Sequence, residues 1–123
     1  MRSAKATTSA RTSQASLALE AELRRCVRVL VEQYKPLKIL LFGSLAEGSP
    51  NEYSDIDLVV IKETSDRFLD RIGEVLQLLC PREPLDVLVY TPAEFEEMVQ
   101  TRPFFRDEIV AKAKTLYDAT QKR

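Results

Sequence analysis

Three aspartates carry the clearest chemistry in this sequence. Asp55 and Asp57 stand two residues apart at the start of an apolar run, and Asp86 stands near the start of a later one. On a β-strand, side chains at positions i and i+2 project from the same face, roughly 6–7 Å apart. Asp55 and Asp57 are therefore expected to hold a divalent cation between them. Mg²⁺ suits the pair because it takes oxygen ligands and completes its shell with water and phosphate oxygens.

Asp86 would join this pair if its strand lies beside theirs and runs in the same direction. Three carboxylates would then meet at one end of a sheet. Taken alone, an acid at the start of a strand is explained at least as well by a solvated turn, in which it accepts hydrogen bonds from backbone amides, as by a metal site. The prediction of a metal site therefore depends on all three aspartates occurring together.

The loop that precedes the acids is a candidate phosphate-binding segment. Gly43 and Ser44 end an apolar run, and a short turn follows at 45–48. Backbone N–H groups at such a helix-like start bind phosphate oxygens. Gly43 allows the backbone to approach a ligand closely, and the Ser44 hydroxyl can donate a hydrogen bond. Anion-binding amides beside metal-binding acids describe a site for a nucleoside triphosphate with Mg²⁺.

Short apolar runs predict the strands that would position these groups. They cover residues 37–42, 55–61 and 85–90, and turn-forming residues bound them. A small edge strand is predicted at 115–118. The expected fold class is α/β (α+β), with a small mixed sheet of three to four strands packed with helices.

Helices are predicted around these strands from apolar residues at steps of three and four. The expected helical segments are 17–34, 65–79, 91–100 and 103–114. The second should begin with an N-cap at Ser65–Asp66, and the third with a capping box formed by Thr91 and Glu94. The 123 residues are expected to form one nucleotide-binding domain over 16–118, with tails at 1–15 and 119–123. The first tail is rich in Ser and Thr, carries Arg and lacks acids, as transit peptides do. It lacks the large apolar residues of an amphipathic face, which favours a disordered tail instead.

Composition excludes several other classes of chemistry. The chain has no histidine, which removes Ser-His-Asp and Cys-His catalysis and imidazole-based zinc sites. Its net charge of -1 gives no bulk attraction to nucleic acid or to a membrane surface. No apolar run approaches the ~20 residues that span a bilayer. Cys26 and Cys80 lack disulfide or metal-site spacing, so we expect a cytoplasmic, reducing setting.

The stretch at 43–60, GSLAEGSPNEYSDIDLVV, closely resembles the signature of the minimal nucleotidyltransferases. These are the smallest members of the DNA polymerase β-like superfamily. Their pattern is Gly-Ser, a spacer, Asp-x-Asp, and a third aspartate on a later strand. The matching positions here are Gly43, Ser44, Asp55, Asp57 and Asp86. The resemblance covers about residues 17–118 and specifies the fold more closely than the substrate.

The resemblance implies transfer of a nucleoside monophosphate, with AMP from ATP expected, to a hydroxyl of a partner macromolecule. Asp55 and Asp57 would hold one or two Mg²⁺ ions, and Asp86 would serve as a further metal ligand or as a general base. Gly43 and Ser44 would hold the β- and γ-phosphates of ATP or another nucleoside triphosphate.

The resemblance also implies a partner protein. Small members of this family often pair with a HEPN-type helical protein, as antitoxin with toxin, and some adenylylate that partner. The chain is expected to be too short for a domain of its own that binds the acceptor, so the acceptor would arrive on such a partner or across a homodimer. Apolar residues at 95–105 are expected to lie mainly in the core, and an exposed remainder would suit docking.

One position departs from the family pattern. Many relatives have arginine where this chain has Glu47. An acid facing the triphosphate would repel it, whereas an acid facing solvent would not matter. Glu47 therefore favours an alternative in which the chain is a non-catalytic module that binds a nucleotide or a partner. A phosphoacceptor receiver domain is a third candidate, which the Gly-Ser loop disfavours.

Overall fold

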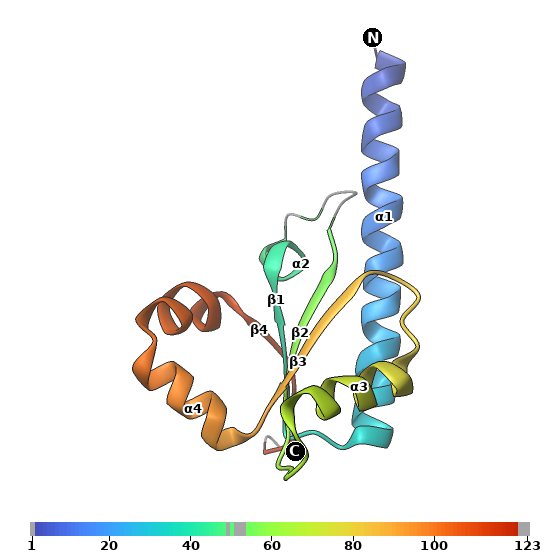
Figure 1. Ribbon diagram of the computed structural model, residues 1–123. Coiled ribbons are helices and arrows are strands. Elements are labelled where there is room, and N and C mark those ends of the chain that lie inside the picture. The colour runs from blue at the N-terminus through green and yellow to red at the C-terminus, as the bar shows by residue number, and fades with distance from the viewer. Residues whose placement is uncertain (1, 49, 51–53, 121–123) are drawn as a thin grey trace.

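The chain forms one layer of β-sheet with helices on both sides (Figure 1). This computed structural model describes residues 2–48, 50 and 54–120, and their side chains from residue 14 onward. The strands are β1 (Lys38–Phe42), β2 (Ile56–Ile61), β3 (Leu85–Tyr90) and β4 (Lys114–Asp118). The helices are α1 (Arg2–Val29), α2 (Gly43–Glu47), α3 (Phe68–Leu79) and α4 (Pro92–Thr101). Short helical turns follow α1 at Leu30–Tyr34 and follow α4 at Phe105–Ile109 and Val110–Lys112.

The four strands make a mixed sheet in the order β3-β2-β1-β4. β1 runs antiparallel to both of its neighbours, β2 and β4. β3 runs parallel to β2, and α3 makes the crossover that a parallel pair requires. The predicted mixed sheet is confirmed, and its fourth strand lies at an edge as expected. The parallel pair matters for the site because Asp57 and Asp86 are register partners in it.

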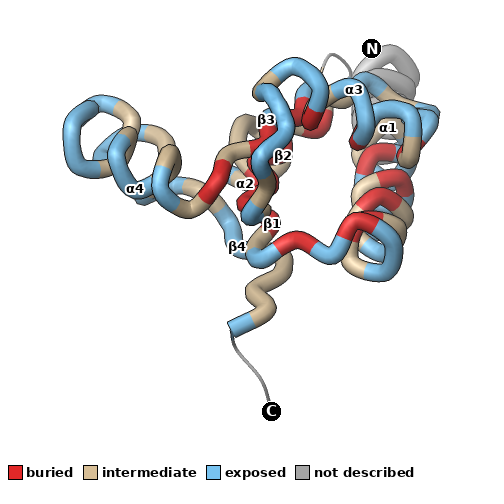
Figure 2. Tube along the Cα trace, turned by 60° about the horizontal axis from the view of Figure 1, so that its bottom comes forward, coloured by how far each residue is buried: buried red, intermediate tan, exposed pale blue. Residues whose placement is uncertain are grey.

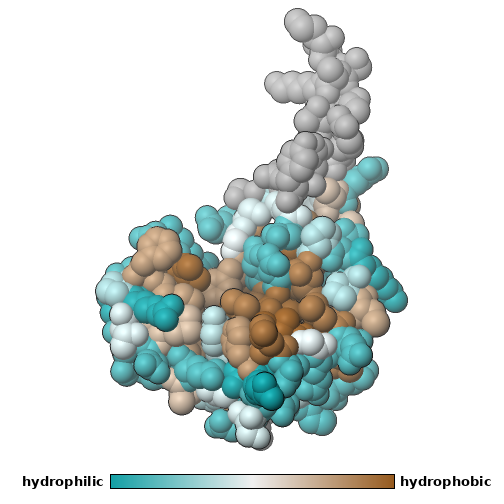
Figure 3. All heavy atoms as spheres, in the orientation of Figure 1, coloured by the Kyte–Doolittle hydropathy of each residue, from teal (hydrophilic) through white to brown (hydrophobic). Residues whose placement is uncertain are grey.

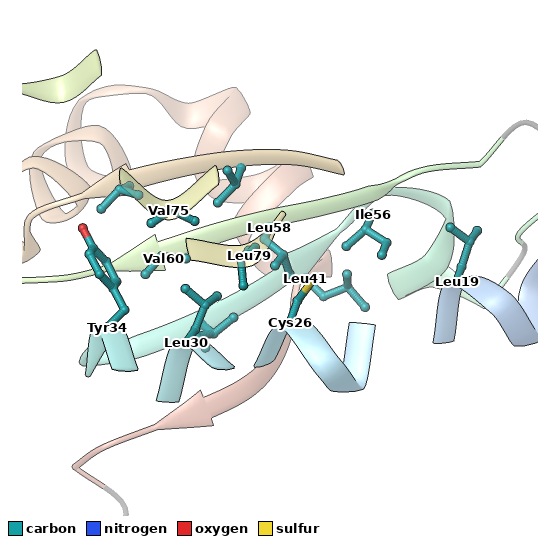
Figure 4. Close-up of a cluster of buried hydrophobic side chains, with 13 residues drawn as sticks. Leu19, Cys26, Leu30, Tyr34, Leu41, Ile56, Leu58, Val60, Val75 and Leu79 are labelled. Atoms are coloured by element: carbon teal, nitrogen blue, oxygen red, sulfur yellow. The ribbon is translucent and has the colours of Figure 1, made fainter. Parts of the chain in front are cut away.

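Helices α1 and α3 cover one face of the sheet, and α4 lies on the other side (Figures 1 and 2). The face beneath α1 and α3 carries the larger core, drawn in Figure 4. Every second residue of β2 points into it, namely Ile56, Leu58 and Val60. The helical side supplies Leu19, Cys26, Leu30, Tyr34, Val75 and Leu79. Burial of such side chains stabilises by roughly 1.5–3 kcal/mol each, which holds β2 and the acids at its start firmly in place.

The opposite face of the sheet carries a smaller apolar cluster of Leu40, Val59 and Ile61. Phe95 of α4 packs against this cluster but is only partly buried. No residue of α4 is fully buried, so the expected core role of the 95–105 segment is met only in part. Phe104, just beyond α4, is 70% exposed and forms the exposed remainder of that segment.

One surface of the molecule exposes apolar side chains from two elements. Figure 3 shows hydrophobic residues gathered over β3 and α3 in the middle of this face, with hydrophilic residues around them. Leu76 of α3 and Leu88 of β3 are both about two-fifths exposed. Leu88 belongs to the face of the sheet that also carries the aspartates, because it lies two residues after Asp86 on β3.

Two ends of helices differ from the sequence prediction. Helix α1 begins at Arg2, so the backbone of residues 2–15 is helical where we expected a disordered tail. The division of the chain into tails and a domain over 16–118 stays a prediction, and residues 121–123 lie outside the described residues. The segment 103–114 was predicted as one helix, but it forms separate π and 3₁₀ turns and then enters β4.

The predicted start of α3 was wrong, whereas that of α4 is confirmed. Arg67 occupies the N-cap position of α3 and supplies no side-chain cap. The Asp66 N–H instead donates to the Thr64 hydroxyl ahead of the helix. At α4, the Glu94 N–H donates to the Thr91 hydroxyl and the Thr91 N–H donates to the Glu94 carboxylate, which is a complete capping box.

Candidate active site

The three aspartates meet at one end of the sheet. Carboxylate oxygens of Asp55, Asp57 and Asp86 all lie within 4.8 Å of one another. Asp55 and Asp57 share a face because they are two residues apart, and the parallel register places Asp86 directly opposite Asp57. Asp86 is exposed and the other two are partly buried, so the cluster opens to solvent on the β3 side. The expected convergence is present, while the chemical role of the three acids stays a prediction.

The surroundings of Asp57 change the protonation of its carboxyl group. Partial burial, and then the negative charges of Asp55 and Asp86, raise the pKa of the Asp57 carboxyl to about 6. Like charges at this separation disfavour one another's ionised form. A bound cation would remove that penalty, since it replaces repulsion between the acids with attraction to a common centre.

Gly43 lies directly against Asp57. Its φ of +78° lies in the left-handed region that favours glycine, and a β-carbon built there would overlap Oδ2 of Asp57. Phe42 and Asp57 are register partners on β1 and β2, which explains why the end of β1 reaches the acid. The glycine therefore lets the backbone turn from β1 into α2 while the Asp57 carboxylate occupies the space beside it.

Helix α2 is a single short turn between β1 and the loop that leads to β2. The hydroxyl oxygens of Ser44 and Ser54 lie 2.8 Å apart, which joins the start of this turn to the residue before Asp55. The contact fixes the position of the Gly43–Ser44 segment relative to the acids. The sequence pattern predicted that the two segments are neighbours, but it gave no sign of this pairing.

Two hollows meet at Asp57 and share Phe42 as a wall. The first has a volume of about 320 Å³ and is lined by Gly43 and by residues from α2 and the turns after α4. The second has a volume of about 350 Å³ and lies over the open face of β2 and β3 beside Asp86 and Leu88. Asp57 therefore borders both hollows, and Asp86 borders the second.

The first hollow is lined by three charged residues besides Asp57. The sequence did not decide whether Glu47 faces the site, and it did not point to Glu108 or Lys112. Glu47 lines the hollow together with Asp57, so this exposed acid borders the site. Glu108 and Lys112 line the same hollow, and their side chains are 3.0 Å apart. No local pattern marks these two residues, because the turns at 105–112 reach the site only through the tertiary fold.

An ion pair between the buried Glu22 and the partly buried Arg25 holds the loop that leads to Asp86. The Glu22 carboxylate accepts from Arg25 at 2.7 and 2.8 Å and from the Arg82 N–H at 2.7 Å. Arg25 also donates to the carbonyl oxygen of Leu79, at the end of α3. Glu22 is 5% exposed, and hydrogen bonding to Arg25 lowers the pKa of its carboxyl to about 2. Helix α1 thus fixes the segment that enters β3.

The mixed sheet, the crossover through α3 and the acids at the strand starts together define a nucleotidyltransferase domain of the polymerase β type. Residues 24–122 match the family described as "Polymerase beta, Nucleotidyltransferase". Because this match covers most of the sequence, the chain belongs to that family. The resemblance stated above is confirmed at this level, and the minimal, antitoxin-type subgroup stays a prediction.

The fold is also found in a solved structure. A protein described as a candidate nucleotidyltransferase from Sulfolobus solfataricus superimposes with a TM-score of 0.64 over 90% of each chain, at 16% sequence identity. At this identity the likeness shows the fold alone. No functionally curated protein matched the sequence. In the described part of the chain, no helix is both long and apolar enough to cross a membrane.

Proposed function

We propose that this protein transfers a nucleoside monophosphate, AMP from ATP, to a hydroxyl group of a partner macromolecule in a Mg²⁺-dependent reaction. The observation that carries this proposal is the meeting of three carboxylates within 4.8 Å beside Gly43. Membership of the nucleotidyltransferase family supports the reaction class. The nucleotide, the metal and the acceptor are our proposals.

The donor set fits one or two Mg²⁺ ions. Three carboxylates from two neighbouring strands offer only hard oxygen ligands, which is the chemistry that Mg²⁺ prefers. Partial burial, and then the charges of Asp55 and Asp86, raise the pKa of Asp57, and a bound cation would relieve the repulsive part of that cost. When bound, Mg²⁺ would neutralise charge on the phosphates and on the departing pyrophosphate. Asp55 and Asp57 would hold it, with Asp86 as a further ligand or as the base.

In the proposed step, the acceptor hydroxyl oxygen forms a bond to the α-phosphorus of ATP. The bond from that phosphorus to the oxygen bridging to the β-phosphate breaks, and pyrophosphate leaves with the electron pair. The hydroxyl proton passes to the Asp86 carboxylate if Asp86 is the base, and to water if it is a ligand. This chemistry depends on position and charge, and therefore requires no histidine.

The two hollows suit the two substrates. The hollow that borders Gly43 would hold the triphosphate, because it lies at the start of α2, where the first N–H groups have no acceptor within the helix. The hollow beside Asp86 would hold the acceptor, which brings its hydroxyl to the acid that is most exposed. Phe42 and Asp57 lie between the two, where the reacting phosphorus would sit.

Label transfer tests this proposal. The protein is incubated with Mg²⁺, a candidate partner and ATP labelled at the α-phosphate, and transfer to the partner is measured. A parallel reaction with γ-labelled ATP should give no labelled acceptor, which separates nucleotidyl transfer from phosphoryl transfer. Asp57→Asn should abolish transfer, and transfer that survives this change would refute the proposed role of the site.

We further propose that the partner that carries the acceptor hydroxyl is a HEPN-type helical protein. The alternative source of the acceptor is a second copy of this chain in a homodimer. We also propose that the protein acts in the cytoplasm. Phe104, with 70% of its surface exposed, is a reasonable point of contact for such a partner. Both cysteines are free thiols, which suits a reducing compartment.

One observation favours a second candidate function. Glu47 lines the proposed triphosphate hollow and adds negative charge to it. If this charge prevents the triphosphate from binding productively, the chain would be a non-catalytic module that binds a nucleotide or a partner. Calorimetry distinguishes the two functions. A tight partner complex that ignores ATP, Mg²⁺ and the Asp57→Asn change would support the module.

A further inference from the structure

The hollow beside Gly43 is unusually acidic for a site that would hold a polyanion. Glu47, Asp57 and Glu108 line it, and they contribute three carboxylates. Mg²⁺ held by the aspartates would neutralise part of a triphosphate, but of the three aspartates Asp57 alone lines this hollow. The outer phosphates would still face Glu47 and Glu108 and would need a positive group near them.

Lys112 supplies that positive group. It lies at the end of the 3₁₀ turn Val110–Lys112 and lines the hollow with Gly43 and Asp57. Among the described residues that line either hollow at Asp57, it is the only Lys or Arg. Glu108 first, and Glu47 to a smaller extent, raise the pKa of the Lys112 ammonium, so it stays charged at neutral pH.

Lys112 is free to exchange its present partner for a phosphate. Its Nζ atom lies 3.0 Å from the Glu108 carboxylate, and the two side chains are 56% and 52% exposed. A solvent-exposed pair of this kind contributes little to folding, because water screens both charges. A phosphate oxygen that carries more charge than one carboxylate can therefore take the ammonium without a large loss of stability.

We propose that Lys112 binds the β- or γ-phosphate of the nucleoside triphosphate and offsets the negative charge of Glu47 in the same hollow. This inference rests on the proposed function, because it assigns a phosphate-positioning residue to that site. It also gives the C-terminal segment a role, since the turns after α4 would close over the phosphates from the side opposite α2.

Binding measurements test the inference without relying on catalysis. Calorimetry with Mg²⁺ and each of ATP, inorganic tripolyphosphate and AMP is carried out on the full chain and on Lys112→Ala. We expect the change to weaken ATP and tripolyphosphate roughly ten- to a hundredfold, the range of one hydrogen bond to a charged group. AMP, which lacks the outer phosphates, should bind as it does to the unchanged protein. Lys112→Arg should retain most of the affinity for ATP.

Two controls separate this role from others. Lys114→Ala alters an exposed lysine two residues away that does not line the hollow, and it should leave ATP affinity unchanged. Mn²⁺ binding without nucleotide should be equal in Lys112→Ala and the unchanged protein, because the metal would contact only the aspartates. If Lys112→Ala lost Mn²⁺ affinity by the same factor as it lost ATP affinity, the inference would be overturned.

The outcomes also distinguish this inference from the proposed function. If the unchanged protein binds ATP and tripolyphosphate but Lys112→Ala binds them equally well, the inference is overturned and the proposed function stands. If the unchanged protein binds no triphosphate in the presence of Mg²⁺, both are overturned. A selective loss of tripolyphosphate and ATP in Lys112→Ala supports both.

Discussion

Gly43 and Asp57 occupy adjoining space so closely that a β-carbon on residue 43 would overlap the Asp57 carboxylate. The glycine also has a φ of +78°, which other residues adopt only with strain. The same residue thus meets two requirements, one of the backbone and one of the side chain that faces it. The Gly-Ser pair is a structural condition for the position of the central acid, apart from any contact it makes with phosphate.

Gly43→Ala should therefore harm both folding and the site. We expect a loss of about 1–2 kcal/mol in the free energy of unfolding from backbone strain. Displacement of the Asp57 carboxylate should also lower Mn²⁺ affinity and reduce nucleotidyl transfer by about a hundredfold, the scale of an ångström-sized misplacement. Urea denaturation and metal titration measure the two effects separately.

The other two glycines provide matched controls. Gly48 has the same φ of +78°, but no atom lies within 4 Å of a β-carbon built there, so Gly48→Ala should show the strain and spare the metal site. Gly73 lies inside α3 with open space around it, and Gly73→Ala should stabilise the protein by about 0.5–1 kcal/mol. If Gly48→Ala lowered metal affinity as much as Gly43→Ala, the contact with Asp57 would not be the cause.

The raised pKa of Asp57 predicts how stability changes with pH in the absence of metal. Its carboxyl has a pKa of about 6 in the folded protein and an ordinary value of 3.8. Between these two pH values the folded state holds more protons than the unfolded state, so stability falls as pH rises from about 4 to about 6. Asp57→Asn should remove this part of the pH dependence and raise stability at neutral pH. Denaturation midpoints across that pH range measure it.

The same acid should respond to its neighbours and to metal. Asp86→Asn removes one of the charges that raise the pKa of Asp57, so that pKa should move down from about 6. Carboxyl carbon chemical shifts followed by NMR would report the change. Mg²⁺ competes with the proton, so its apparent affinity should fall as pH drops below about 6. An Asp57 titration that Asp86→Asn leaves unchanged would show that the two acids do not interact as described.

The elements and the acids could be predicted because their signals are local. The alternation in β2 puts Asp57 on one face and Ile56 and Leu58 on the other, and the capping box at Thr91 is complete within four residues. The prediction that Asp86 joins the other two acids needed one further assumption, that the apolar runs 55–61 and 85–90 pair in parallel. A predicted helix between those runs makes that assumption reasonable, because a parallel pair needs a crossover.

The parts of the site that the sequence did not predict depend on distant contacts. Glu108 and Lys112 reach the hollow only because the turns after α4 fold back toward α2. The same segment reads as one helix by periodicity, since its breaks into π and 3₁₀ turns carry no residue signal such as proline or glycine. Glu22 lies on the buried stripe of α1 despite its charge, because its partner Arg82 comes from a loop 60 residues away.

The hydrogen bond from the Arg82 N–H to Glu22 predicts that Glu22, which lies outside the site, supports the site. Glu22→Ala removes the acceptor for the Arg82 N–H and for Arg25, and leaves Arg25 partly buried without its acid. We expect a loss of about 2–3 kcal/mol in the free energy of unfolding, the scale of hydrogen bonds to a charged group. Glu20→Ala changes an exposed acid on the same helix and should alter stability by less than about 0.5 kcal/mol.

The effect of Glu22→Ala should also reach Asp86, because Arg82 begins the segment that enters β3. Hydrogen exchange at the backbone amides of residues 82, 83, 85 and 86 should become faster in Glu22→Ala, while exchange in β1 should change much less. Metal affinity should fall in the same variant as the third carboxylate loses its fixed position. If exchange at 82–86 is unchanged while global stability falls, Glu22 stabilises the packing of α1 and does not position the acid.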